Sequence, residues 1–449
     1  MAVPALARAL ACVAAAAAVH ALAPPPDALR TGLALFVLVG GLWMTQALHV
    51  TITALGVPVL ATLTGVLDLR AALAPFAHPV IFLFLGSFAL AAALQQQGLD
   101  RALAASIVRL AGGSRPRAVM LLMLATAVLS MWISNTAATA MLLPLALAML
   151  DGADPQRPAG PREQAFVLLG VAYSASIGGI ATLVGSPPNA IAAAQAGVSF
   201  TQWLGFGLPL AAVLLPLMVL TLAVVLRPRL AGQVPVKPAE PLPWTAPRRR
   251  TVAIFGLSVL GWIAGTPLAR ALGLTGDADS VVALLAVVAL VTSGAVDWPQ
   301  IERRTPWHVL LLFGGGLALS EAMSASGASR FLAMQLIAAV AGAPAWLVLL
   351  GLVAFVVFLT EFVSNTACAA LLVPIVIGVA GALGLPPALL AAAIATSASC
   401  AFMLPVATPP NALVYATERV PQATMMRCGV VLNAVCIGVI PFLGLRLWT

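Results

Sequence analysis

Apolar runs about 20 residues long recur along the whole chain, and each is long enough to cross a bilayer as a helix. Of the 449 residues, 62% are hydrophobic and only 8% are charged, whereas roughly a quarter of the residues of a soluble domain carry charge. The chain is therefore predicted to be an all-α polytopic membrane protein. Nine runs are predicted to be simple spans, at 2–22, 31–49, 51–69, 79–97, 204–226, 251–271, 279–297, 306–326 and 427–447.

The first run resembles a cleavable signal peptide in two respects. It contains Arg8 and ends with the small-residue pattern Ala21-Leu22-Ala23. Its apolar part, however, is close to a full span in length. We interpret it as a retained first transmembrane helix within residues 1–30.

Two further apolar stretches each carry Ser-Asn-Thr near the middle. Each stretch is too long for one span of ~20 residues and too short for two spans with a turn. A hairpin that turns near mid-depth and returns to the same side fits the length, provided that protein or water covers its irregular backbone. We predict re-entrant hairpins at about 117–150 and about 344–382, with Ser134-Asn135-Thr136 and Ser364-Asn365-Thr366 at their tips.

Two more apolar stretches are interrupted by paired prolines. One contains Gly185-Ser186-Pro187-Pro188-Asn189 and the other contains Ala407-Thr408-Pro409-Pro410-Asn411. A Pro-Pro pair removes two amide donors and clashes with the preceding turn, so a continuous helix is excluded. Broken helices are predicted at about 164–197 and about 386–416, each made of two half-helices joined by unwound backbone.

The basic residues indicate how the chain is oriented. With a cytoplasmic N-terminus and hairpins that return to their own side, 17 of the 22 Lys and Arg residues lie inside. Five lie outside, namely Arg30, Arg70, Arg270, Arg330 and Arg446. This bias follows the positive-inside rule. It predicts a bacterial inner membrane protein with an external C-terminus and a cytoplasmic linker at 227–250. The net charge of +8 therefore belongs to loops and does not indicate nucleic-acid binding.

The motifs recur in the same order in both halves of the chain. The Ser-Asn-Thr blocks are 230 residues apart and the Pro-Pro-Asn blocks are 222 apart, and Phe84–Leu90 parallels 313–319 at an offset of 229. Arg101 is predicted to be cytoplasmic and its counterpart Arg330 external. We therefore expect about eleven transmembrane helices, comprising the first helix and two inverted five-helix repeats at 31–226 and 251–449. Inverted repeats with broken helices are typical of secondary transporters.

The polar motifs predict the chemistry of a central site. Half-helix N-termini attract anions through free N–H groups and partial positive charge. Freed carbonyls and the Ser, Thr and Asn side chains provide oxygen ligands of the kind that hard cations prefer. No Lys or Arg lies near the motifs. Cations bound together with an anion would balance its charge, which favours symport.

At these residues the sequence resembles the divalent anion/sodium symporter family, which carries dicarboxylates, citrate or sulfate. The resemblance extends over nearly the whole chain and rests on the doubled Ser-Asn-Thr motif, the doubled Pro-Pro-Asn break and the inverted repeats. It implies sodium as the coupling ion, no organic cofactor, and a homodimer in lipid. In that dimer a mobile part of each protomer carries the hairpins and broken helices across the membrane in an elevator-like motion.

The resemblance also implies the site residues. The first sodium site maps onto Ser130, Ser134, Asn135 and the backbone at Gly185. The second maps onto Thr360, Val363 through its backbone, Asn365 and the backbone at Ala407. The substrate contacts map onto Ser134, Asn135, Thr136, Ser186, Pro187, Ser364, Asn365, Thr366, Thr408 and Pro409.

The function expected from these features is sodium-coupled symport of a small dicarboxylate such as succinate, malate or fumarate. The alternatives are a dicarboxylate exchanger and a citrate-selective, sulfate-selective or proton-coupled member of the same family. The sequence contains no HExxH, no GxSxG and no buried pair of aspartates, so an enzyme is not expected. A channel is disfavoured because paired polar hairpin tips suit alternating access better.

Glu361 is the one acidic residue beside a Ser-Asn-Thr motif, and its counterpart in the first repeat is Met131. A carboxylate at this depth is costly and often functional. We expect it to bond hairpin backbone, with proton coupling or gating as the alternative.

Overall fold

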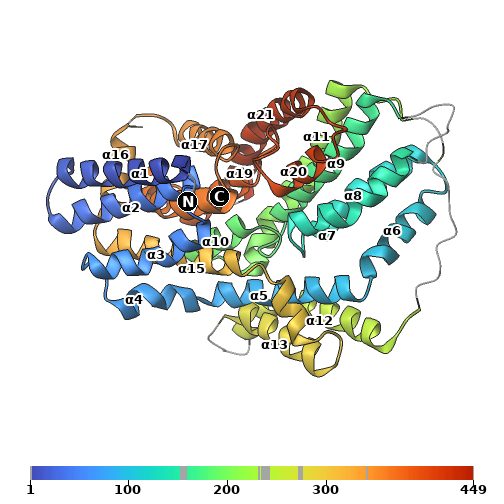
Figure 1. Ribbon diagram of the computed structural model, residues 1–449, viewed down its shortest axis with the longest axis horizontal. Coiled ribbons are helices and arrows are strands. Elements are labelled where there is room, and N and C mark those ends of the chain that lie inside the picture. Colours follow the sequence, from blue (N-terminus) through green and yellow to red (C-terminus); the bar gives the residue numbers. More distant parts are fainter. Residues whose placement is uncertain are drawn as a thin grey trace.

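The computed structural model describes residues 3–151, 159–230, 233, 243–271, 277–339 and 342–447. Every regular element within these ranges is a helix, which confirms the all-α class (Figure 1). The middle of the predicted linker at 227–250, residues 231–232 and 234–242, lies outside the described residues. Eight described helical segments are long and apolar enough to cross a membrane: Ala5–Leu22, Asp27–Thr45, Leu69–Gln96, Pro161–Ile180, Phe200–Leu226, Trp307–Ala325, Asn365–Leu383 and Gln422–Leu447. The count of about eleven spans stays a prediction.

The elements after the first helix, α1 (Val3–Leu22), fall into two series. The first comprises α2 (Asp27–Thr45), α3 (Val50–Leu63), α4 (Leu69–Leu73), the 3-10 helix η1 (Ala74–Ala77), α5 (Pro79–Gln96), α6 (Leu99–Leu110), α7 (Arg115–Ser130), α8 (Asn135–Asp151), α9 (Pro161–Ile180), α10 (Pro187–Ala196) and α11 (Phe200–Leu226). The second comprises α12 (Ala246–Ala271), α13 (Ala278–Thr292), α14 (Trp298–Arg304), α15 (Trp307–Ala325), α16 (Ala328–Ala339), α17 (Ala345–Leu359), α18 (Asn365–Leu383), α19 (Pro387–Ala398), α20 (Pro409–Tyr415) and α21 (Gln422–Leu447).

The α-helices of the two series match in order, with only the 3-10 helix η1 lacking a counterpart among the described elements, and their contacts are exchanged between the halves. Helix α5 packs against α13, and α3, the counterpart of α13, packs against α15, the counterpart of α5. Likewise α10 contacts α18 and α19, while α20 contacts α8 and α9. A two-fold relation between the halves requires this exchange. The division into repeats at 31–226 and 251–449 stays a prediction.

Both predicted helix breaks are present, and each Pro-Pro pair lies directly after the unwound backbone instead of within it. Helix α9 ends at Ile180 and α10 begins at Pro187, and α19 ends at Ala398 while α20 begins at Pro409. Each Pro-Pro pair therefore lies in the first turn of the second half-helix, where no N–H is needed. The unwound segments are residues 181–186, here called the first link, and residues 399–408, the second link.

The Ser-Asn-Thr blocks lie at tight turns between paired helices. Helices α7 and α8 contact each other, as do α17 and α18, and α8 and α18 begin at Asn135 and Asn365. The helical hairpin shape agrees with expectation, whereas entry and exit on one side of the membrane stays a prediction. Sequence reasoning did not anticipate the short helices α4, α6, α14 and α16 that separate the longer ones.

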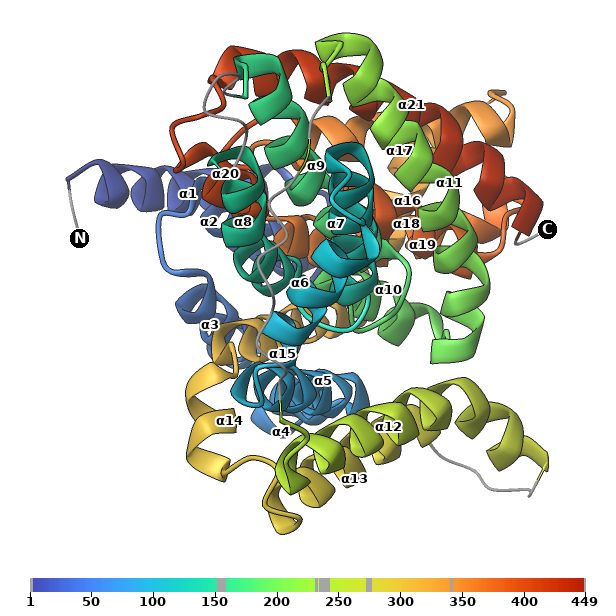
Figure 2. The same cartoon turned by 90° about the vertical axis from the view of Figure 1, so that its right-hand side faces the viewer.

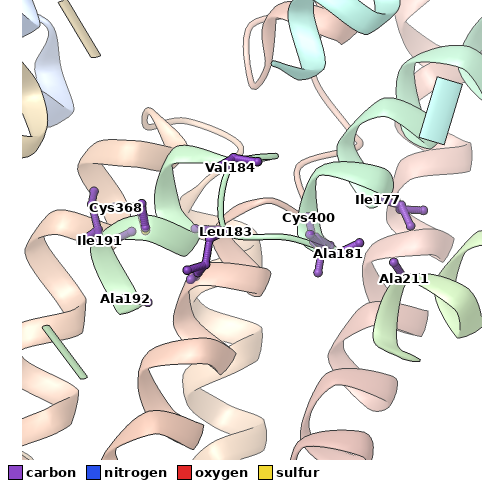
Figure 3. Close-up of a cluster of buried hydrophobic side chains, with 14 of the residues drawn as sticks. Ile177, Ala181, Leu183, Val184, Ile191, Ala192, Ala211, Cys368 and Cys400 are labelled. Atoms are coloured by element: carbon purple, nitrogen blue, oxygen red, sulfur yellow. The ribbon is translucent and has the colours of Figure 1, made fainter. Parts of the chain in front are cut away.

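Helix α9 lies inside the molecule, with 94% of its apolar segment buried against 33% of that of α11. It packs on α7, α8, α11 and α20, which Figure 2 shows surrounding it. The apolar core continues past the first link: Ile177 and Ile191 lie on either side of it, with Cys368 and Cys400 nearby (Figure 3). Protein therefore covers the unwound backbone, as a membrane interior requires.

Candidate functional site

Four polar groups, from three helices and the first link, converge behind the first hairpin tip. Ser130 Oγ, at the end of α7, donates to the Ala175 carbonyl of α9 at 2.6 Å and lies 2.7 Å from the Asn135 side-chain amide. The same amide atom lies 3.1 Å from the Ala175 carbonyl and 3.1 Å from the Gly185 carbonyl of the first link. We call Ser130, Asn135, Ala175 and Gly185 the first oxygen cluster.

The Asn135 amide satisfies this cluster in one of two orientations. With its nitrogen inward, it donates to Ser130 and to both carbonyls. With its oxygen inward, four oxygens face one another and only the Ser130 hydroxyl supplies a proton. A hard cation prefers such oxygens. With the nitrogen inward the cluster is satisfied by its own hydrogen bonds, and with the oxygen inward it presents four oxygens to one another.

The second half repeats the hydroxyl, amide and helix carbonyl of this arrangement. Thr360 Oγ1, which follows α17, lies 2.7 Å from Asn365 Oδ1 and donates to the Ala398 carbonyl at the end of α19 at 2.8 Å. We call Thr360, Asn365 and Ala398 the second oxygen cluster. Val363 and Ala407 are buried in the adjoining tip and link, and their backbone role in the second sodium site stays a prediction.

The predicted substrate residues surround these clusters with different exposures. Ser186 and Thr408 are buried, whereas Thr136 and Pro409 are exposed; the remaining six are half-buried, namely Ser134, Asn135, Pro187, Ser364, Asn365 and Thr366. Ser186 Oγ lies 3.1 Å from Ser399 Oγ, so the two links meet. The hydroxyls of Ser134 and Thr408 accept from the Ala137 and Asn411 backbone N–H groups and thereby cap α8 and α20. The structure does not test which of these residues contact substrate.

The Asn of each Pro-Pro-Asn motif closes its own link. Asn189 Nδ2 donates to the Gly179 and Thr182 carbonyls at 2.8 and 2.7 Å. Asn411 Nδ2 donates to the Ala401 and Leu404 carbonyls, at 3.0 Å each. These carbonyls lost their helical partners where the helix unwound. Each Asn lies in the half-helix that follows its link, and its hydrogen bonds stabilise the unwound backbone of that link.

Sequence reasoning missed two components of the clusters. The Ala175 and Ala398 carbonyls come from Ser-Ala-Ser tripeptides at 174–176 and 397–399, each about ten residues before a Pro-Pro-Asn motif, whereas the third Ser-Ala-Ser of the chain, at 324–326, precedes no such motif. The other component is Gly179, where a Cβ would overlap Asn135 Oδ1 and lie 3.0 Å from the Gly185 carbonyl. Only Gly at this position leaves room for the Asn135 amide.

Glu361 was expected to bond the backbone of its own hairpin. Instead, it bonds the backbone of the second link. Its carboxylate accepts from the backbone N–H groups of Phe402, Met403 and Leu404 and from Asn433 Nδ2. The carboxylate is buried. These three backbone N–H groups have no helical acceptor because the helix is unwound here. The Glu361 carboxylate accepts their hydrogen bonds instead.

The ion pairs of the described residues lie at helix ends, away from the clusters. Arg115 pairs with Glu163 at 3.2 Å, with both side chains nearly buried. Arg419 donates to Asp151 at 2.6 Å near the protein surface, and this hydrogen bond lowers the pKa of the Asp151 carboxyl. No group of three or more potential metal-binding His, Cys, Asp or Glu residues occurs in the described part of the chain.

A fold of exchanged half-repeats, with unwound links and oxygen clusters inside a membrane domain, defines a membrane transporter and not an enzyme. Comparison with known proteins agrees. A family model described as "Citrate transporter" matches residues 41–395 and 280–448. The chain belongs to this family, and its resemblance to the divalent anion/sodium symporters is confirmed.

Individual relatives are similar over most of the chain. A Haemophilus influenzae protein described as a transporter is 47% identical over 93% of this chain and 92% of its own. The sodium-dependent dicarboxylate transporter SdcS of Staphylococcus saprophyticus is 33% identical over 89% of this chain and 82% of its own. The crystal structure of the Alcanivorax borkumensis YdaH transporter shares the fold, with a TM-score of 0.60 at 17% identity over 86% of this chain and 87% of that one.

Proposed function

We propose that the protein is a sodium-coupled symporter for small dicarboxylates of the succinate, malate and fumarate type. The observation that carries the proposal is the pair of matched oxygen clusters, each built from a hydroxyl, an Asn amide and a backbone carbonyl of a broken helix. Each cluster fits one sodium ion without any fixed positive charge nearby. Sodium is the coupling ion, and no organic cofactor takes part.

The substrate dianion lies between the hairpin tips in this proposal. Helices α8 and α18 both begin at the tips, with Asn135 and Asn365 as their first residues, so their free N–H groups and positive dipole ends are available to carboxylates. Because no described Lys or Arg pairs with groups of the clusters, the sodium ions supply the balancing charge. Anion and cations therefore bind together, which is the condition for symport.

The relative named as a sodium-dependent dicarboxylate transporter supports this choice of ion and substrate. The description of the matching family model favours citrate as a second candidate substrate. A dicarboxylate exchanger, a sulfate carrier and a proton-coupled transporter are the other members of the family that the same fold accommodates. Transport assays separate all of these.

The test is uptake of radiolabelled succinate into proteoliposomes with and without an inward sodium gradient. We expect uptake to require sodium and to be inhibited by malate and fumarate more strongly than by citrate or sulfate. Stronger inhibition by citrate would move the substrate class to tricarboxylates. Uptake that ignores sodium but needs internal dicarboxylate would identify an exchanger, and uptake driven by a proton gradient alone would identify proton coupling.

We further propose that the protein works as a homodimer in a bacterial inner membrane, with a cytoplasmic N-terminus. The helical hairpins and broken helices would move together past the remaining helices, in an elevator-like shift that carries the loaded clusters from one side to the other. The contacts of α10 with α18 and α19, and of α20 with α8 and α9, support one mobile unit. A detergent-corrected mass equal to a single chain would remove the dimer from this proposal.

A further inference from the structure

The second half of the molecule contains a buried charge that the first half lacks. Glu361, 1% exposed, immediately follows Thr360 of the second oxygen cluster. Its Oε1 accepts from Phe402 N–H at 2.8 Å and Asn433 Nδ2 at 2.8 Å. Its Oε2 accepts from Leu404 N–H at 3.0 Å, and Met403 N–H donates to both oxygens at 2.9 and 3.1 Å. All four partners are donors, which suits an ionised carboxylate because that group only accepts.

The negative charge of Glu361 has no cationic partner among the described residues, whose ion pairs all involve other carboxylates. Buried charges are usually paired or bound to a metal. Here hydrogen bonds stabilise the carboxylate but do not cancel its net charge. In a membrane-embedded protein that charge acts on nearby cations with little screening.

The position of this charge is fixed by the second link. Phe402 donates its N–H to Glu361, and its carbonyl accepts from Tyr173 Oη of α9 at 2.6 Å. A Cβ at Gly429 of α21 would overlap the same carbonyl. The link is therefore bound from three sides, and the carboxylate that it surrounds stays beside the second cluster.

The first link is held without charge. Met131 is the counterpart of Glu361, and its backbone carbonyl accepts from Thr182 Oγ1, whose oxygen in turn accepts from Gly185 N–H at 3.2 Å. The two clusters thus offer the same kinds of ligand in unequal electrostatic fields.

From this asymmetry we propose that Glu361 is a positioning residue that makes the second oxygen cluster bind sodium more tightly than the first. The inference rests on the sodium coupling proposed above and adds a loading order. Sodium occupies the Thr360 and Asn365 cluster first, and the Ser130 and Asn135 cluster then sets the sodium concentration that transport requires.

Equilibrium binding of radioactive sodium to the purified protein, without substrate, tests the order. We expect a tight and a weak component in the wild type. Ser130→Ala keeps the tight component, whereas Thr360→Val loses it. Glu361→Gln weakens the tight component at least about tenfold, which corresponds to about 1.4 kcal/mol, and Glu361→Asp, which retains the charge, restores most of it. Thermal unfolding of each variant reports structural damage separately.

Three outcomes would overturn the proposal. One is that Ser130→Ala loses the tight component while Thr360→Val keeps it. Both of these variants retain Glu361, so this comparison tests the loading order even if the Glu361 variants do not fold. Another is a Glu361→Gln protein that melts earlier but binds sodium as the wild type does, which would make Glu361 purely structural. A wild type that binds no sodium would overturn the proposed function as well, whereas the first two outcomes leave that function standing.

Discussion

At the scale of single residues, Asn135 and Asn365 occupy equivalent places, each with its amide 2.7 Å from a hydroxyl oxygen. Alanine at either position removes one oxygen from a cluster and one proposed substrate contact. We expect Asn135→Ala and Asn365→Ala to reduce sodium-driven succinate uptake to background while the protein still inserts and remains monodisperse. A suitable control is Ser258→Ala, since the buried Ser258 hydroxyl bonds only Ile254 of its own helix at 2.8 Å. Normal uptake in both Asn variants would refute the site.

Two glycines give a matched pair for testing the geometry of the first cluster. A Cβ at Gly179 would overlap the Asn135 amide, whereas a Cβ at Gly205 of α11 meets nothing within 4 Å. We expect Gly179→Ala to raise the sodium concentration for half-maximal uptake at least about tenfold, because Asn135 must shift. Gly205→Ala should leave uptake unchanged and stabilise the helix slightly, by up to about 1 kcal/mol. Equal behaviour of the two variants would show that Gly179 does not position Asn135.

The side chains that form the oxygen clusters could be predicted from the sequence, but the backbone carbonyls that join them could not. Ser130, Asn135, Thr360 and Asn365 were expected as ligands, and the structure brings each pair together. Every residue carries a carbonyl, so nothing in its identity marks Ala175 as a contributor. Its flanking serines, repeated around Ala398, were the available signal.

At the scale of elements, the breaks were predictable because consecutive prolines cannot continue a helix. Their exact extent was not, because it depends on tertiary contacts. Asn189 bonds the Thr182 carbonyl inside the first link, whereas the longer second link is also bound by Glu361 and Tyr173. The short helices α6 and α16 escaped prediction because their apolar content is that of a connecting segment as much as of a helix.

The nearly buried ion pair of Arg115 and Glu163 joins the N-terminal ends of α7 and α9, and the two side chains are 4% and 9% exposed. Glu163→Gln would leave a buried guanidinium uncompensated, at a cost of about 3 kcal/mol. We expect a clearly lower Tm in detergent. The control is Asp27→Asn, because the Asp27 side chain in its pair with Arg30 is 88% exposed and such pairs contribute at most about 1 kcal/mol. A Glu163→Gln protein as stable as Asp27→Asn would contradict this reading.

A surface pair links the end of α8 to the chain after α20. Arg419 donates to Asp151 and lowers the pKa of that carboxyl. The pair therefore stabilises the folded state above the unfolded pKa of about 4 and loses this effect as the pH falls through the lowered value. We expect Arg419→Gln to reduce Tm slightly at pH 7, by the equivalent of no more than about 1 kcal/mol, and we expect this difference to shrink as the pH falls below about 4. A difference from wild type that grows on acidification would exclude this role.

At the scale of the whole molecule, three sequence blocks at nearly constant offsets were enough to predict a doubled architecture. The structure extends that match to every α-helix from α3 to α11 and reveals the exchanged contacts between halves. Sequence reasoning predicted the symmetry but not its departures. The charge of Glu361 in one half and the glycine-lined first link in the other depend on contacts between segments far apart in the chain.

The central claim is that the two oxygen clusters couple sodium to dicarboxylate movement. Accumulation of succinate in proteoliposomes, with an inward sodium gradient as the only driving force, tests it most directly. We predict concentrative uptake that collapses when a sodium ionophore is added and that is absent from the Asn135→Ala, Asn365→Ala double variant. Accumulation that survives the sodium ionophore and collapses only with a protonophore would contradict the account.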